Sequence, residues 1–152
     1  MESFERNINA SISRLNSDTI STKASLLDLN HNMRVELKID LNSKKILEAD
    51  AQIVRAPFKI CRSTVHLIKN IVGLMVERGI ARKLSRILGG NSGCTHLFEL
   101  TMEAIRFSSN ILLGFGSVGT DEWIDREESD EEFIRKSKPY LKNMCLPFKE
   151  GK

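Results

Sequence analysis

The chain has 152 residues and a net charge of +3, and hydrophobic and charged residues make up 41% and 28% of it. This composition is typical of a soluble globular protein with one core. The first residues carry acids and no apolar run, and no apolar stretch approaches the length of a membrane span, so neither a secretory signal nor a membrane partner is expected. Three cysteines argue against a disulfide framework, and we expect a cytoplasmic protein.

The strands are expected between residues 20 and 54. The stretch "VELKID" alternates apolar and polar residues, and "LNSKK" after it supplies turn residues. Alternation continues on both sides of this pair, which predicts a three-stranded antiparallel meander with one half-buried face. The apolar positions are Ile20, Ala24, Leu26, Val35, Leu37, Ile39, Ala49, Ala51 and Ile53.

The helices are expected after Pro57, where the period changes. A first helix carries Val65, Ile68, Ile71, Val72 and Met75 on one side and has Ser63 or Thr64 as its N-cap, and Gly79 ends it. A short amphipathic helix, "IARKLSRIL", ends at Gly89-Gly90. A long helix follows from His96 until Gly114 and Gly116, with a buried stripe from Leu97, Leu100, Ala104, Phe107, Ile111 and Leu112.

The C-terminal part has a different composition. Residues 121–132 hold eight acids and one arginine, a net charge of −7, so the rest of the chain carries +10. Ser129 and Glu132 form a capping box for one more short helix, which Pro139 is expected to interrupt. The acidic run is a solvated surface or tail, or it binds a basic protein partner or a second copy of this chain. The basic residues elsewhere are scattered and form no nucleic-acid motif, so nucleic acid is not an expected partner.

Strands first and helices after predict an α+β fold with the helices packed on one sheet face. We expect an N-terminal extension over residues 1–19, a core domain over 20–116, and an acidic linker with a helical tail over 117–152.

The stretch "GGNSGCTHLFEL" contains the most specific candidates for chemistry. Cys94 and His96 lie where a loop becomes the long helix, and Cys61 lies just before the first helix. A helix start lowers the pKa of a cysteine, and thiolates bind metals and attack electrophiles. We expect Cys61, Cys94 and His96 to bind zinc or an iron–sulfur cluster, with His31 or Cys145 as a fourth ligand and Glu99 as a possible partner of His96.

Other functions remain open from the sequence. In a thiol-dependent enzyme, Cys94 would be the nucleophile and His96 its base. In a noncatalytic binding or assembly module, the cysteines would be structural, because a buried free cysteine behaves as a small hydrophobic residue. The residues therefore do not decide whether the protein is an enzyme.

Four short motifs resemble a bacterial family, domain of unknown function 2889. They are "HNM" at 31–33, Pro57-Phe-Lys-Ile-Cys61, Val72-Gly-Leu74 and Gly93-Cys-Thr-His-Leu97. The resemblance covers most of residues 20–115, and the Gly-Cys-x-His-Leu motif is its most specific part. Asn32 replaces the acid that is typical of this family, and the resemblance implies no established activity.

The order of the expected elements is also similar, more distantly, to iron–sulfur cluster scaffold proteins of the NifU and IscU type. On that comparison Cys61 matches the scaffold's second cysteine, and Cys94 with His96 matches its histidine–cysteine pair. His31 stands where the scaffold has its first cysteine, and the scaffold's chaperone-recognition motif is absent. This resemblance implies the topology and, at the site, an iron–sulfur cluster.

Overall fold

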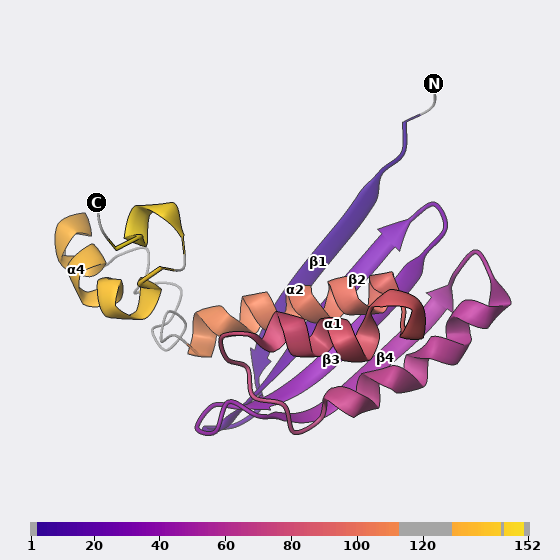
Figure 1. Ribbon diagram of the computed structural model, residues 1–152, viewed down its shortest axis with the longest axis horizontal. Coiled ribbons are helices and arrows are strands. Elements are labelled where there is room, and N and C mark those ends of the chain that lie inside the picture. Colours follow the sequence, from indigo (N-terminus) through magenta and orange to yellow (C-terminus); the bar gives the residue numbers. More distant parts are fainter. Residues whose placement is uncertain (1–2, 113–128, 144, 151–152) are drawn as a thin grey trace. The chain divides into compact units, whose positions relative to one another are not determined.

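The computed structural model describes residues 3–112, 129–143 and 145–150, and the chain divides into two units, residues 1–112 and 113–152. The first unit contains one antiparallel sheet in which each strand pairs with its neighbour in sequence (Figure 1). Its strands are β1 (Arg6–Arg14), β2 (Thr19–Asp28), β3 (Asn32–Asp40) and β4 (Ile46–Arg55).

The α+β class and the meander are confirmed, but the sheet has four strands where the sequence indicated three. The additional strand is β1, formed by residues that we expected to be an N-terminal extension. It pairs with β2 over its whole length, from Arg6 opposite Asp28 to Arg14 opposite Ile20. Its residues Ile8, Ala10 and Ile12 alternate with polar ones as in a strand with one apolar face, so the pattern was present in the sequence and the prediction overlooked it.

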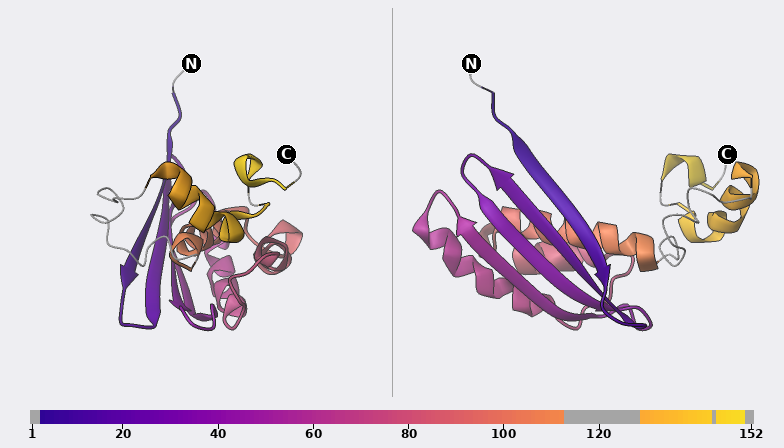
Figure 2. Two further views of the ribbon diagram at one scale, coloured as in Figure 1. Left: turned by 90° about the vertical axis from the view of Figure 1, so that its left-hand side faces the viewer. Right: turned by 180° about the vertical axis from the view of Figure 1, so that it is seen from behind.

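Helices cover one face of the sheet (Figure 2). They are the 3₁₀ helix η1 (Lys59–Ile71), α1 (Ile80–Leu88), the short 3₁₀ helix η2 (Gly90–Ser92) and α2 (Thr95–Leu112). Strand alternation is confirmed: Val35, Leu37 and Ile39 are buried under the helices, and Glu36 and Lys38 lie on the opposite face. The described helices contain no segment long and apolar enough to cross a membrane.

The first helix differs from the expectation in its winding. Residues 59–71 form a 3₁₀ helix, which has three residues per turn. Side chains three positions apart therefore share a face, and Val65, Ile68 and Ile71 pack against the core. Val72 and Met75 follow the helix, and both are exposed, so the stripe predicted with an α-helical period was wrong at these two positions.

The core lies between the sheet and the helices. It holds apolar side chains from β2, β3, β4, η1, α1 and α2, and a buried hydrogen bond of 2.8 Å between the hydroxyls of Thr22 and Ser108 joins β2 to α2. Phe107, which we expected in the buried stripe of α2, is 38% exposed. The predicted helix ends at Gly114 and Gly116 lie outside the described residues. The largest fully buried side chains are Ile20, Leu26, Met33, Leu37, Ile39, Ile46, Ile68, Ile71, Leu84, Leu88, Leu97 and Leu100.

The second unit contains α4 (Asp130–Leu141) and the 3₁₀ helix η3 (Leu146–Phe148). The predicted N-cap is confirmed, because the Ser129 hydroxyl accepts a hydrogen bond of 3.2 Å from the backbone N–H of Glu132. Pro139 lies inside α4 and does not interrupt it, contrary to the prediction. It occurs in the last turn, where a missing N–H removes only one helical hydrogen bond.

Candidate functional site

Two histidines that are distant in sequence meet where α2 begins. His31 lies between β2 and β3, and His96 is the second residue of α2. Their rings are 4.0 Å apart between centroids, with an angle of 37° between the ring planes. His31 is 9% exposed and His96 is partly buried. The structure therefore places His31, from the "HNM" motif, in contact with His96, from the "GCTHL" motif.

Asp28, the last residue of β2, fixes the position of His31. Its Oδ1 lies 3.0 Å from His31 Nδ1 and accepts hydrogen bonds from the backbone N–H groups of Asn30 and His31, at 2.8 and 2.7 Å. A carboxylate at this position accepts from Nδ1–H, so in the neutral imidazole the lone pair is on Nε2. The arrangement orients one imidazole for proton transfer or for ligation.

Arg6 and Glu99 complete a charged cluster around this pair. Arg6, from β1, forms an ion pair of 2.8 Å with Asp28 Oδ2, and its Nη1 lies 3.7 Å from Glu99 Oε2. That Glu99 oxygen is buried and has no hydrogen-bond partner among the described residues. Glu99 follows His96 by three residues on α2, so both side chains project from the same side of the helix. The sequence suggested that Glu99 accepts a hydrogen bond from His96, but in the structure Glu99 lies beside Arg6 and no such hydrogen bond forms among the described residues.

The pKa values of Asp28 and His96 follow from this arrangement. Burial raises the pKa of Asp28, but hydrogen bonds from the Asn30 and His31 backbone and from the His31 and Arg6 side chains outweigh burial, and the pKa falls well below its ordinary value. Burial lowers the pKa of His96, and the neighbouring His31 lowers it further. A neutral His96 beside a fully ionised Asp28 is therefore the expected state near pH 7.

The three cysteines belong to different segments of the fold. Cys61 lies in the first turn of η1 rather than before it, Cys94 directly precedes α2, and Cys145 is exposed in the second unit. All three are free thiols. No hydrogen bond, ion pair or ring contact joins Cys61 or Cys94 to His31 or His96 within residues 3–112. In the described part of the chain, no three His, Cys, Asp or Glu side chains are grouped so as to hold a metal ion.

The glycines of "GGNSGC" lie in the turn between α1 and α2. A Cβ on Gly93 would lie 2.0 Å from the carbonyl oxygen of Leu88, so only glycine fits there. The next residue, Cys94, donates its backbone N–H to the same oxygen at 2.7 Å, and its carbonyl accepts from Phe98 in the first helical bond of α2. Cys94 packs against the core. This geometry explains why glycine is required at position 93 and why the backbone of Cys94 is held at the start of α2. Neither explanation involves a reaction or a ligand at the thiol.

Sequence reasoning did not find Asp28 and Arg6. Asp28 has a recognisable local pattern, because an aspartate that accepts from the backbone N–H groups two and three residues later is typical of an Asx-turn. Arg6 had no such pattern and lay in the segment predicted to be an extension. Its role depends on the pairing of β1 with β2, which places it opposite Asp28.

Together, the four-stranded meander, its single helical layer and the histidine pair with its charged neighbours define an α+β protein with a polar site at the N-terminal end of α2. Residues 8–107 match the family described as "Protein of unknown function (DUF2889)", and the chain belongs to this family. The match contains all four motifs on which the resemblance was based, whereas Cys145 lies beyond it. No curated protein and no solved structure significantly matches the chain, and the likeness to iron–sulfur scaffold proteins is not supported.

Proposed function

We propose that His31 and His96 bind a divalent transition-metal ion such as zinc. The observation that carries this proposal is the carboxylate of Asp28 on His31 Nδ1 with a second imidazole, that of His96, next to the same ring; binding of one ion by both rings requires them to move apart from their 4.0 Å stacking contact. Metal-binding histidines commonly donate their other ring N–H to a carboxylate, which fixes the tautomer and orients the ligating nitrogen. The lowered pKa of His96 favours the neutral imidazole that a metal requires.

The chain fits such an ion only in part. Two imidazoles are available, and no third grouped ligand exists among the described residues. The remaining coordination positions would be filled by water or by a bound substrate, as in metal sites that keep open positions. An iron–sulfur cluster is less compatible, because clusters are usually held by four cysteines and neither Cys61 nor Cys94 contacts the histidine pair through a polar interaction.

Metal titration of histidine variants tests the proposal. We expect His31→Gln and His96→Gln each to weaken Zn²⁺ binding at least about tenfold, because each removes one of two protein ligands. Isothermal titration calorimetry at pH 7 measures the affinity, and a metal analysis of protein purified without chelator measures the bound ion. His66→Gln is the matched control, because His66 is an exposed histidine of η1.

Two results would contradict it. Unchanged Zn²⁺ affinity in the His31→Gln/His96→Gln double variant excludes the pair as the metal site. Loss of metal or of visible absorption in Cys61→Ser/Cys94→Ser, with the histidine variants unaffected, would instead favour the cysteine site that the sequence indicated.

The thiol-enzyme alternative makes a separate prediction about reactivity. Cys94 is partly buried and packs against the core, whereas Cys145 is exposed. If Cys94 is structural, we expect iodoacetamide at pH 7 to modify Cys145 first and Cys94 last, because access limits the reaction. Peptide mass spectrometry over time resolves the two sites. Faster modification of Cys94 than of Cys145 would favour a nucleophilic Cys94.

A noncatalytic assembly role also stays a prediction. Most of the acidic segment 121–132 lies outside the described residues. Its binding to a basic partner or to a second copy of the chain therefore rests on its charge alone.

A further inference from the structure

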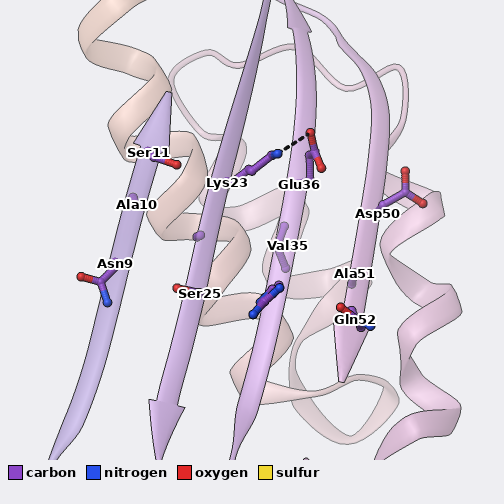
Figure 3. Close-up of a pocket in the computed structure, with 12 residues that line it drawn as sticks. Asn9, Ala10, Ser11, Lys23, Ser25, Val35, Glu36, Asp50, Ala51 and Gln52 are labelled. Carbon is purple, nitrogen blue, oxygen red and sulfur yellow. Dashed lines mark ion pairs between the residues drawn. The ribbon is translucent and has the colours of Figure 1, made fainter. Parts of the chain in front are cut away.

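The sheet face opposite the helices carries two rows of polar side chains that the histidine site does not use. Strand register places Asn9, Ser25, Arg34 and Gln52 side by side in one row, and Ser11, Lys23, Glu36 and Asp50 in the next. Figure 3 shows the labelled members of these rows on neighbouring strands, with the covering helices behind the sheet. Together they line a hollow of about 560 Å³.

The charged side chains of the second row all have ion-pair partners within the protein. Lys23 Nζ lies 3.6 Å from Glu36 Oε1, and the same oxygen accepts a hydrogen bond of 2.7 Å from the buried Ser21 hydroxyl. Asp50, at the β4 edge, pairs with Lys69 of η1. These three acidic and basic side chains of the hollow therefore have partners within the protein.

Arg34 is the exception. It is exposed, and its guanidinium has no ion-pair or hydrogen-bond partner among the described residues. It lies in the third strand of four, with Ser25 opposite on β2 and Gln52 opposite on β4. Asn9 completes the row on β1. The hollow thus offers an unpaired cation between a hydroxyl and an amide, each of which donates hydrogen bonds.

We propose that this hollow binds the carboxylate of a small polar molecule, with Arg34 as its anchor. The planar guanidinium donates two parallel hydrogen bonds to a carboxylate, and Ser25 and Gln52 supply further donors beside it. The lining residues carry two positive and two negative charges, Lys23 and Arg34 against Glu36 and Asp50. A monoanion is favoured over a phosphate dianion, because the one unpaired cation of the hollow balances a single negative charge and the other charged side chains are already paired.

The proposal does not depend on metal binding at the histidines. His96 and Glu99 belong to α2, which covers the other face of the sheet (Figure 2). Failure of one proposal therefore leaves the other unaffected.

The test uses ¹H–¹⁵N NMR titrations of the full chain with three probes: lactate, its neutral analogue lactamide, and inorganic phosphate. We expect lactate to shift the backbone amides of residues 9, 25, 34 and 52 saturably, lactamide to leave them unchanged, and phosphate to bind more weakly. Arg34→Gln should weaken lactate binding at least tenfold, and Arg34→Lys should lie between it and the unmodified chain, because lysine keeps the charge and loses the bidentate geometry. Arg82→Gln is the matched control, since Arg82 is an exposed cation of α1 without an ion-pair partner among the described residues.

The spectra of the variants also report whether they are folded, and no hydrogen bond or ion pair of the Arg34 side chain among the described residues is lost in them. Absence of saturable shifts in the hollow, or equal lactate binding by Arg34→Gln, overturns the proposal. Tighter binding of phosphate than of lactate overturns the assignment to a carboxylate.

Discussion

Replacement of Gly93 by alanine is expected to lower the free energy of unfolding by about 3 kcal/mol or more, which is the range of severe overpacking. The new Cβ would lie 2.0 Å from Leu88 O and 2.2 Å from Leu88 C, both of which are backbone atoms at the end of α1. Relief requires the turn between α1 and α2 to open, and the hydrogen bond from Cys94 N–H to Leu88 O would be lost with it. Urea unfolding followed by circular dichroism at pH 7 measures the change.

Gly90→Ala is the control within the same turn. Gly90 has a positive φ of 63°, but a Cβ there meets no atom within 4 Å. The expected cost is therefore only the left-handed conformation of an alanine, about 1 kcal/mol. Equal destabilisation by the two substitutions would show that the close approach of Leu88 is not what requires glycine at position 93.

Replacement of Asp28 by asparagine is expected to lower the free energy of unfolding at pH 7 by about 2 kcal/mol, because charge-assisted hydrogen bonds become neutral ones and Arg6 loses its ion pair. The effect depends on pH. The folded protein holds the pKa of Asp28 below its ordinary value of 3.8, so the stabilisation is present in full above that value. It is lost as the pH falls from there towards the lower pKa of the folded state.

The difference between the unmodified chain and Asp28→Asn should therefore shrink between pH 7 and pH 3, as measured by urea unfolding at both values. Asp50→Asn removes the same charge from an exposed ion pair with Lys69, and it should cost less than about 1 kcal/mol. A difference for Asp28→Asn that stays constant down to pH 3 would contradict the role of its ionised carboxylate.

Local periodicity was sufficient to predict much of the fold. The stretch "VELKID" has the alternation of a strand with one buried face, and α1 has its apolar residues at helical spacing with glycine after it. Both patterns depend only on neighbouring residues, so both were confirmed. The 3₁₀ winding of η1 was missed, because Val65, Ile68 and Ile71 fit a period of 3.6 and a period of 3.0 equally well.

The candidate site was predicted only in part. His31 and His96 were both proposed as ligands. The prediction, however, placed His96 in one site with Cys61 and Cys94, because all three lie near the start of an expected helix. Which side chains meet is decided by the packing of α2 on the sheet and by the pairing of β1 with β2. These contacts span long separations in the chain, and periodicity contains no information about them.

The meander also has a consequence expected for folding. Every strand pairs with the strand next to it in the chain, so the sheet forms by closing short hairpins, which has a small entropic cost. The contact between His31 and His96, by contrast, joins residues 65 positions apart and exists only after α2 has packed onto the finished sheet. The contact between the rings is therefore a marker of the fully folded protein. The NMR chemical shifts of the ring protons should differ between the native protein and any species in which only the sheet has formed.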